Sequence, residues 1–296
     1  MKSKTVIVTG ASGFIGSNLS LSLIDKGFDV HILSREASDL SILSRHEGNF
    51  TNHIYDGSIQ KLKEVFEEVR PSYVFHLASL FLAKHDDSNI SDLLESNIVF
   101  STHLVEAMVS SNVKYLINTG TSWQHFNDSD YDPVNLYAAT KQSFETILEF
   151  YLQTNEIKVI TLKLFDTYGP KDPRKKILSL LNDYAKSGET LLMSPGEQMI
   201  DLVHIDDIIK AYELAYESID LQAERHIQYG ISSNRPLSLK DLVLVFEGVL
   251  GAKVRIDWGK REYREREVMV PWIKSAQLPG WKAEITLEEG LLHTFG

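Results

Sequence analysis

Residues 6–16 read VIVTGASGFIG, an apolar run that opens directly into Gly10, Gly13 and Gly16, spaced three apart. A tight strand-to-helix turn needs a residue without a Cβ, and so does the close approach of backbone to a pyrophosphate. The unpaired N–H groups of the helix that follows would face the phosphates. The alternative is a glycine-rich turn that binds nothing, but the flanking apolar strand and helix favour a dinucleotide-binding turn.

Short apolar runs alternate with segments of helical period after this turn, which predicts repeated βαβ units and a parallel sheet. We expect strands at residues 5–9, 29–34, 52–55, 73–77, 115–119 and 158–164, and helices at 14–26, 58–69, 91–110 and 136–154. The rhythm breaks beyond residue 170. The sequence therefore predicts an α/β protein: a Rossmann-type, doubly wound parallel sheet over residues 1–165 and a smaller C-terminal α/β substrate lobe over 166–296. A helix near 206–218 is expected to return to the first domain.

Composition limits the classes of partner. The 296 residues include 30 Lys and Arg against 41 Asp and Glu, a net charge of −11, which disfavours nucleic acid and anionic membranes. The absence of cysteine excludes disulfides, thiolate catalysis and Cys-ligated zinc. No apolar run approaches the ~18 residues of a membrane helix, and the N-terminus reads as a first strand, not a signal peptide. We expect a soluble, cytoplasmic protein without a metal site.

The end of the second expected strand bears on which dinucleotide is bound. A carboxylate there would hold the ribose hydroxyls of NAD, whereas an arginine would pair with the 2′-phosphate of NADP. This chain has Ser34 and Arg35 and no acid at the strand tip, which favours NADP with NAD as the alternative. The other interpretation of Arg35 is a surface arginine neutralised by Glu36. Asp56 is a candidate for the adenine amino group, or else a cap of the helix beginning near Ser58.

A second motif, YAATK at residues 137–141, places a tyrosine and a lysine one helical turn apart. The positive charge of Lys141 would stabilise the phenolate of Tyr137, whose free pKa near 10 is too high for easy proton exchange at pH 7. The loop after residue 119 offers Thr121 and Ser122 to hold a carbonyl oxygen. The alternative is a helix surface pair. With the glycine turn upstream, the motif predicts a nicotinamide enzyme that moves a hydride to or from a carbonyl carbon.

The chain resembles the extended short-chain dehydrogenase/reductases, in particular those that act on nucleotide sugars. The resemblance is nearly end to end and rests on residues 9–16, 76–79, 97, 119–122, 137–141, 165–170, 196–198, 203–207, 264–267 and 280–281. It implies that Tyr137 exchanges the proton, Lys141 lowers its pKa and binds ribose, and Thr121 holds the reacting oxygen. The expected cofactor contacts are Gly10, Ser12, Gly13, Phe14, Ile15, Gly16, Ser34, Arg35, Asp56, Gly57, Leu77, Ala78, Ser79, Asn97, Thr119, Tyr137, Lys141 and Leu164.

The resemblance also narrows the reaction. The 4,6-dehydratases of this family carry an Asp-Glu pair directly after the catalytic threonine, whereas this chain has Ser122-Trp123, so dehydration is not expected. Arg35 favours a reductase that consumes NADPH, and the chain is similar to 4-ketoreductases that make 6-deoxy and 3,6-dideoxy sugars. We therefore expect NADPH-dependent reduction of a nucleotide-linked 4-keto-6-deoxyhexose. The alternatives are an NAD-dependent nucleotide-sugar 4-epimerase and a non-catalytic NAD(P)-sensing protein, although such sensors tend to lose the tyrosine and lysine.

The resemblance implies a substrate site made by Thr121, Ser122, Asp166, Arg174 and Arg264. Ile200, Asp166 and Lys163 depart from the arginine, asparagine and arginine that the family commonly has at these places. A carboxylate at 166 is unfavourable near a diphosphate unless it is countered, and Arg174, Lys175 or Lys176 could compensate. Family members pair the helices expected at 91–110 and 136–154 across a dimer interface. Because both helices carry apolar residues beyond one stripe, a homodimer is expected.

Overall fold

The computed structural model describes residues 4–296, which divide into two compact units. The first unit runs up to Thr121 and includes Asn135–Lys163 and Ile209–Tyr229; the second comprises Ser122–Val134, Leu164–Ile208 and Gly230–Gly296. This division differs from the two domains expected from the sequence, which met at a single boundary after residue 165. Residues 122–134 belong to the second unit and residues 209–229 to the first, because the chain passes between the units more than once.

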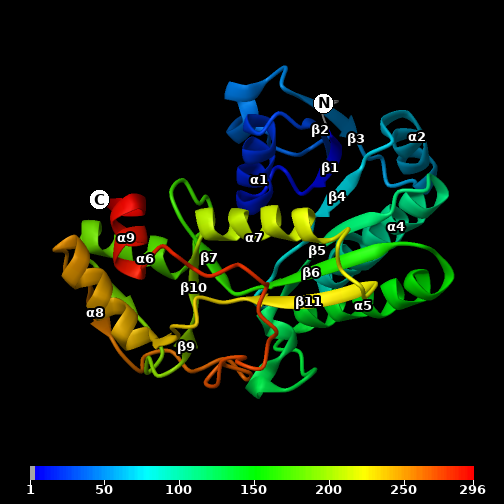
Figure 1. Ribbon diagram of the computed structural model, residues 1–296. Coiled ribbons are helices and arrows are strands. Elements are labelled where there is room, and N and C mark those ends of the chain that lie inside the picture. Colours follow the sequence, from blue (N-terminus) through cyan, green and yellow to red (C-terminus); the bar gives the residue numbers. More distant parts are fainter. Residues whose placement is uncertain (1–3) are drawn as a thin grey trace. The chain divides into compact units, whose positions relative to one another are not determined.

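The first unit is built on a seven-stranded sheet (Figure 1) with the order β11-β6-β5-β4-β1-β2-β3. Its strands are β1 (Thr5–Thr9), β2 (Asp29–Ser34), β3 (Phe50–Ile54), β4 (Tyr73–His76), β5 (Tyr115–Thr121), β6 (Lys158–Leu164) and β11 (His226–Ile231). β1 pairs in parallel with β2 and with β4, so that Val8 lies opposite both Ile32 and Phe75. All three side chains are fully buried. This is the expected Rossmann-type sheet, and its strand order reverses between β1 and β4, where ligands of such sheets bind.

The helices of the first unit are α1 (Phe14–Asp25), α2 (Ile59–Val69), α3 (Ile90–Leu94), α4 (Phe100–Ser110), α5 (Leu136–Thr154) and most of α7 (Ile205–Ser218). The first residues of α7 belong to the second unit. Short 3₁₀ segments lie at Ser41–His46 and Asp87–Asn89. The helix expected at 91–110 is interrupted by a π-helical turn at Glu95–Val99. Fully buried residues of α2, α4 and α5, among them Phe66, Leu104 and Phe144, share one core.

The second unit holds three small two-stranded sheets. β7 (Asp166–Tyr168) pairs with β10 (Leu202–His204), β8 (Thr190–Leu192) with β13 (Arg255–Asp257), and β9 (Met199–Ile200) with β12 (Leu237–Ser238). Helices α6 (Ile177–Ser187), α8 (Leu239–Leu250) and α9 (Leu287–Phe295) accompany them, with 3₁₀ segments at Ser122–Gln124 and Phe126–Asp128. Leu181, Leu242, Phe246 and Leu291 are fully buried in a separate core. Each unit therefore has buried residues that pack among themselves, which explains why the chain divides into two compact units.

Within residues 4–296, no helix combines the length and apolarity needed to cross a bilayer. The same part of the chain contains no group of three or more His, Asp or Glu side chains placed to hold a metal ion.

Candidate cofactor and active site

The glycine turn leaves no room for side chains. Gly10 has a φ of +74°, and a Cβ built on it would lie 2.6 Å from the backbone nitrogen of Ala78. A Cβ on Gly16, in the first turn of α1, would lie 2.1 Å from the carbonyl oxygen of Gly10. Since real Cβ atoms do not approach so closely, both positions require glycine. The turn therefore has the close backbone approach that a pyrophosphate cradle needs, and it leads into a helix N-terminus.

Gly16→Ala is expected to destabilise the protein and to abolish dinucleotide binding, because the added methyl group overlaps the Gly10 carbonyl. The matched control is Gly248→Ala, also within a helix, where a Cβ would meet nothing within 4 Å. This control should be neutral or stabilising by about 0.5–1 kcal/mol, because alanine is the better helix former. Thermal unfolding with and without NADP or NAD tests both. Normal cofactor binding by Gly16→Ala would contradict the assignment of the glycine turn as the site of the pyrophosphate.

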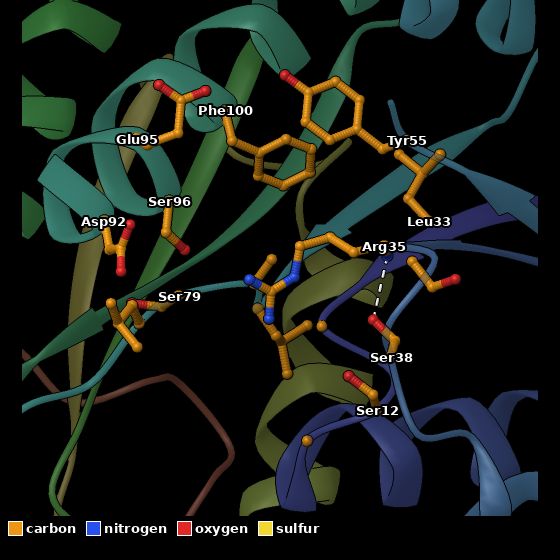
Figure 2. Close-up of a pocket in the computed structure, with 16 residues that line it drawn as sticks. Ser12, Leu33, Arg35, Ser38, Tyr55, Ser79, Asp92, Glu95, Ser96 and Phe100 are labelled. Atoms are coloured by element: carbon orange, nitrogen blue, oxygen red, sulfur yellow. Dashed lines mark hydrogen bonds between the residues drawn. The ribbon is translucent and has the colours of Figure 1, made fainter. Parts of the chain in front are cut away.

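A cavity of about 420 Å³ lies beside the turn (Figure 2). Eight of the expected cofactor residues line it: Gly10, Ser12, Gly13, Ser34, Arg35, Leu77, Ala78 and Ser79. They come from the carboxyl-terminal ends of β1, β2 and β4, the edge at which parallel sheets bind their ligands. The cavity therefore lies where the strand order of the sheet reverses.

Other expected cofactor residues do not line this cavity: Phe14, Ile15, Gly16, Asp56, Gly57, Asn97, Thr119, Tyr137, Lys141 and Leu164. Eight lining residues were missed: Leu33, Ser38, Tyr55, Leu80, Asp92, Glu95, Ser96 and Phe100. The rule that parallel strands end at one edge of the sheet could have found Leu33 and Tyr55. No sequence pattern marks residues 92–100 as cavity residues, because only the packing of α3, the π turn and the start of α4 brings them to the cavity.

Arg35 points into the cavity from the tip of β2 (Figure 2). Its backbone N–H donates to Ser38 Oγ at 3.1 Å, and Ser38 N–H donates back to the Arg35 carbonyl at 3.0 Å, so a tight turn holds the arginine. Among residues 4–296, neither Glu36 nor any other carboxylate forms an ion pair with the Arg35 guanidinium. Glu36 therefore does not hold the guanidinium by a direct ion pair, and the guanidinium faces the cavity.

Two neighbouring polar side chains have partners within the protein. Asp56 Oδ1 accepts from the Ser58 N–H at 2.9 Å and from the Ser58 hydroxyl at 2.7 Å, and these bonds lower the pKa of the Asp56 carboxyl. The N-cap of α2 is Ser58, whose hydroxyl accepts from Lys61 N–H at 3.2 Å, so Asp56 is not the cap and instead braces the capping residue. The Ser34 hydroxyl donates to Asn52 Oδ1 at 2.9 Å, so its proton is already used.

A buried hydrogen-bond chain fixes the end of β4. Thr9 Oγ1 accepts from the N–H groups of Leu77 and Ala78, both at 3.1 Å, so its own proton goes to His76 Nδ1 at 2.9 Å. His76 must then carry its proton on Nε2 and donate it to Ser101 Oγ at 2.8 Å. Burial and the charge of Lys141 hold the pKa of His76 well below its usual value. His76 is therefore a neutral structural histidine.

Asn97 sits in the π-helical turn and uses its whole side-chain amide. Its Oδ1 accepts from the Ser79 hydroxyl at 3.0 Å and from Leu80 N–H at 2.7 Å. Its Nδ2 donates to the Leu80 carbonyl at 3.0 Å and to Thr140 Oγ1 at 2.9 Å. The extra residue of a π turn aims a side chain that a regular helix would point elsewhere. Asn97 thus ties the loop after β4 to helix α5 instead of lining the cavity.

Tyr137 lies in the first turn of α5 and is 9% exposed. Its ring meets the edge of the Phe81 ring at 5.0 Å between centroids, and its hydroxyl hydrogen-bonds with Ser79. Burial raises the pKa of this phenol to about 12. A residue not predicted, the fully buried Tyr212 of α7, shares a 2.7 Å hydrogen bond with Thr119 Oγ1, and burial raises the pKa of its hydroxyl. Thr119 therefore anchors a second phenol.

Lys141 is 1% exposed, one turn after Tyr137 on the same helix. Burial lowers the pKa of its ammonium to about 8, and the charge of Glu145 opposes this shift. In the described part of the chain, no residue forms a hydrogen bond or an ion pair with Lys141 Nζ. A buried cation with no such partner suits the ribose hydroxyls of a bound dinucleotide. Thr121 ends β5 in the same unit and is 8% exposed.

The expected substrate residues other than Thr121 belong to the second unit, where Ser122 opens a 3₁₀ segment. Asp166 pairs with Lys176 at 3.3 Å, so the added carboxylate is countered as expected. The guanidinium of Arg174 contacts Asp172 at 2.6 and 2.7 Å. A diphosphate approaching Arg174 would therefore compete with a carboxylate that is already bound.

Arg264, the other expected phosphate ligand, is similarly engaged. Its guanidinium contacts Glu267 at 2.8 and 3.2 Å and lies 5.4 Å from the centre of the Trp123 ring. Lys163 is not a substitute for it, because its ammonium is buried in the first unit and pairs with Glu145 at 3.3 Å. Both cations expected to bind phosphate, Arg174 and Arg264, thus pair with acidic neighbours within the second unit.

The sheet, the glycine turn and the cavity at the reversal of strand order define a dinucleotide-binding enzyme of the Rossmann class. The sequence pattern of the NAD dependent epimerase/dehydratase family matches residues 6–230. The chain belongs to this family and is an NAD(P)-dependent enzyme of the extended short-chain dehydrogenase/reductase type.

Named relatives differ in their reactions. CDP-abequose synthase of Yersinia pseudotuberculosis is 30% identical over 270 residues, which cover 90% of this chain and 91% of the relative. UDP-glucuronate 4-epimerase of Thermodesulfobacterium geofontis is 27% identical over 318 residues, which cover 97% of this chain and 94% of the relative.

The solved structure of UDP-glucose 4-epimerase from Thermotoga maritima with UDP-glucose has a TM-score of 0.86 at 24% identity, covering 98% of this chain and 97% of that one. MoeE5, solved with UDP-glucuronic acid and NAD, has a TM-score of 0.84 at 24% identity, with the same coverage. The likeness to these structures establishes the fold.

Proposed function

We propose that the protein is an NADPH-dependent reductase that converts a nucleotide-linked 4-keto-6-deoxyhexose to its 4-hydroxy product. The observation that carries this proposal is Arg35, a guanidinium that points into the cofactor cavity from a strand tip without an acid. Such a group favours the 2′-phosphate of NADP, and reductases draw on NADPH. The relative named CDP-abequose synthase supports the substrate class.

In the proposed mechanism, NADPH supplies the hydride to the carbonyl carbon when it is bound. The Tyr137 hydroxyl gives its proton to the carbonyl oxygen, and the Thr121 hydroxyl holds that oxygen in place. Because the buried phenol has a pKa raised to about 12, it is a poor acid until a positive charge stabilises the phenolate. We assign that charge to Lys141, whose ammonium also binds the ribose of the nicotinamide half. Asn97 keeps Ser79 beside the phenol through the 3.0 Å bond.

In the second unit, we propose that Arg264 and Arg174 bind the diphosphate of the sugar nucleotide. Each would then exchange part of its contact with Glu267 or Asp172 for phosphate oxygens, which bind arginine in the same bidentate manner. Lys176 keeps the charge of Asp166 from opposing the diphosphate.

The function is tested by incubating the protein with NADPH and CDP- or dTDP-4-keto-6-deoxyglucose. We expect loss of absorbance at the nicotinamide band, and a product with a hydroxyl at C4. Omission of the sugar gives the background rate of NADPH oxidation. Failure to oxidise NADPH with any 4-keto-6-deoxy sugar nucleotide would remove the proposal.

The second candidate is a 4-epimerase with bound NAD, which the relative named UDP-glucuronate 4-epimerase favours. An epimerase must keep its cofactor and return the hydride. The purified protein would then release NAD on denaturation and would interconvert UDP-sugars without added NADPH. Identifying the cofactor that the denatured protein releases therefore separates the epimerase, which would release NAD, from the proposed NADPH-dependent reductase.

We also propose a homodimer, supported by apolar side chains that α3 and α5 expose. Leu94 is 40% exposed and Phe150 is 63% exposed. A monomeric mass in solution would contradict this proposal.

A further inference from the structure

Three residues of α5 follow one another at intervals of four: Tyr137, Lys141 and Glu145. This spacing places them on one face of the helix. All three are buried, with exposed fractions of 9%, 1% and 2%. The proposed chemistry uses the phenol and the ammonium, but it gives no role to the carboxylate. A buried carboxylate is costly unless a cation accompanies it, so its presence here needs a reason.

The cation that accompanies Glu145 comes from the sheet. Lys163 Nζ, on β6, lies 3.3 Å from Glu145 Oε2, and both side chains are 2% exposed. Burial lowers the pKa of Lys163, and the carboxylate opposes that shift. Glu145 is also the group whose charge supports the Lys141 ammonium. One carboxylate therefore serves two buried lysines, and the three groups together carry one net positive charge.

The other ionisable groups near Lys141 add no charge at neutral pH. His76, from β4, interacts with the charge of Lys141 but is buried and neutral, with hydrogen bonds at both ring nitrogens. Tyr137 on the same helix and Tyr212 from α7 are phenols whose pKa values burial raises. Among these groups, Glu145 is the one that can balance the Lys141 ammonium.

We propose that Glu145 is a positioning residue of the active site: its buried carboxylate keeps Lys141 protonated in surroundings that favour the neutral amine, and Lys163 limits the strength of this effect by sharing the carboxylate. The role of Lys141 in turnover rests on the proposed function. The charge balance of the three buried groups does not, because it depends only on their positions in the fold.

The two ends of the ion pair should act in opposite directions on Lys141. Glu145→Gln removes the supporting charge, so Lys141 should lose its proton about one pH unit lower than in the wild type. Lys163→Met removes the ammonium that pairs with Glu145 at 3.3 Å, so more of the carboxylate's charge acts on Lys141, which should lose its proton roughly half a pH unit higher. In kcat/KM for reduction, the alkaline limb, near pH 8 in the wild type, should move down in the first variant and up in the second.

The proton loss is read directly by NMR of ¹³C,¹⁵N-lysine-labelled protein, with the Lys141 signal assigned by its loss in Lys141→Arg. This readout requires no substrate. If no sugar nucleotide is reduced but the Lys141 titration shifts as stated, the proposed function fails and the role of Glu145 stands. If turnover occurs and the Lys141 titration is the same in Glu145→Gln as in the wild type, the role of Glu145 is wrong.

Two control variants carry the same substitutions at exposed sites. Glu149→Gln is one turn further along α5, where the carboxylate is 55% exposed, and Lys114→Met removes a lysine that is 54% exposed. Neither should move the Lys141 titration. Should Glu145→Gln fail to fold, Lys163→Met decides alone: a shift to higher pH supports the proposal, whereas no shift or a shift to lower pH overturns it. General loosening of the core could not move the two variants in opposite directions.

Discussion

Tyr137→Phe is expected to lower kcat for reduction of a 4-keto-6-deoxy sugar nucleotide by about 10³-fold, within the range that proton transfer by a positioned group contributes. The substitution removes only the hydroxyl. The ring that meets Phe81 at 5.0 Å between centroids remains, so folding and cofactor binding should be preserved. Stopped-flow or steady-state NADPH oxidation gives the rate, and fluorescence titration with NADPH gives the dissociation constant.

The matched control is Tyr151→Phe, which removes a hydroxyl from the same helix α5. Tyr151 donates to Glu106 at 3.1 Å and does not line the cavity. Its loss should change kcat less than about twofold, because the hydroxyl interacts only with a surface carboxylate. A Tyr137→Phe variant with wild-type kcat would place the proton transfer elsewhere.

Arg35→Ala should lower kcat/KM for NADPH by roughly 10- to 100-fold while leaving kcat/KM for NADH unchanged. Hydrogen bonds to charged groups contribute about 1.5–3 kcal/mol, and each 1.4 kcal/mol corresponds to a factor of ten. The loss falls on NADPH alone because only NADP carries the 2′-phosphate that the guanidinium would bind. Initial rates with each cofactor at a fixed sugar concentration give both values.

Arg255→Ala serves as the control, since Arg255 is an exposed arginine on β13 in the second unit. It should affect neither cofactor. Equal losses with NADPH and NADH in Arg35→Ala would mean that Arg35 supports the shape of the cavity and does not read the phosphate. A wild-type enzyme that prefers NADH would contradict the assignment of Arg35 before any variant is made.

The most reliable sequence predictions concerned local structure. The boundaries of β1, β2, β6 and α5 were predicted to the residue, because each is set by a short apolar run or by a cap close in sequence. The N-cap of α5 is one example: Asn135 accepts from Ala138 N–H at 2.9 Å, three residues on. The helix expected at 91–110 is interrupted by a π turn. The turn forms because Asn97 makes hydrogen bonds to Leu80, in the loop after β4, and to Thr140 on α5, which are distant in sequence.

By itself, the sequence determined that the chain begins with a dinucleotide-binding βαβ unit and carries a tyrosine and lysine on one helix face. Both patterns depend on residues a few positions apart, so backbone geometry alone relates their side chains. Only the tertiary structure decided which side chains complete the site. Asp92 and Phe100 reach the cavity, Tyr212 reaches Thr119, and Lys163 reaches Glu145 through packing between elements distant in sequence. Burial by that packing, and not the spacing of the residues, lowers the pKa of Lys141 to about 8.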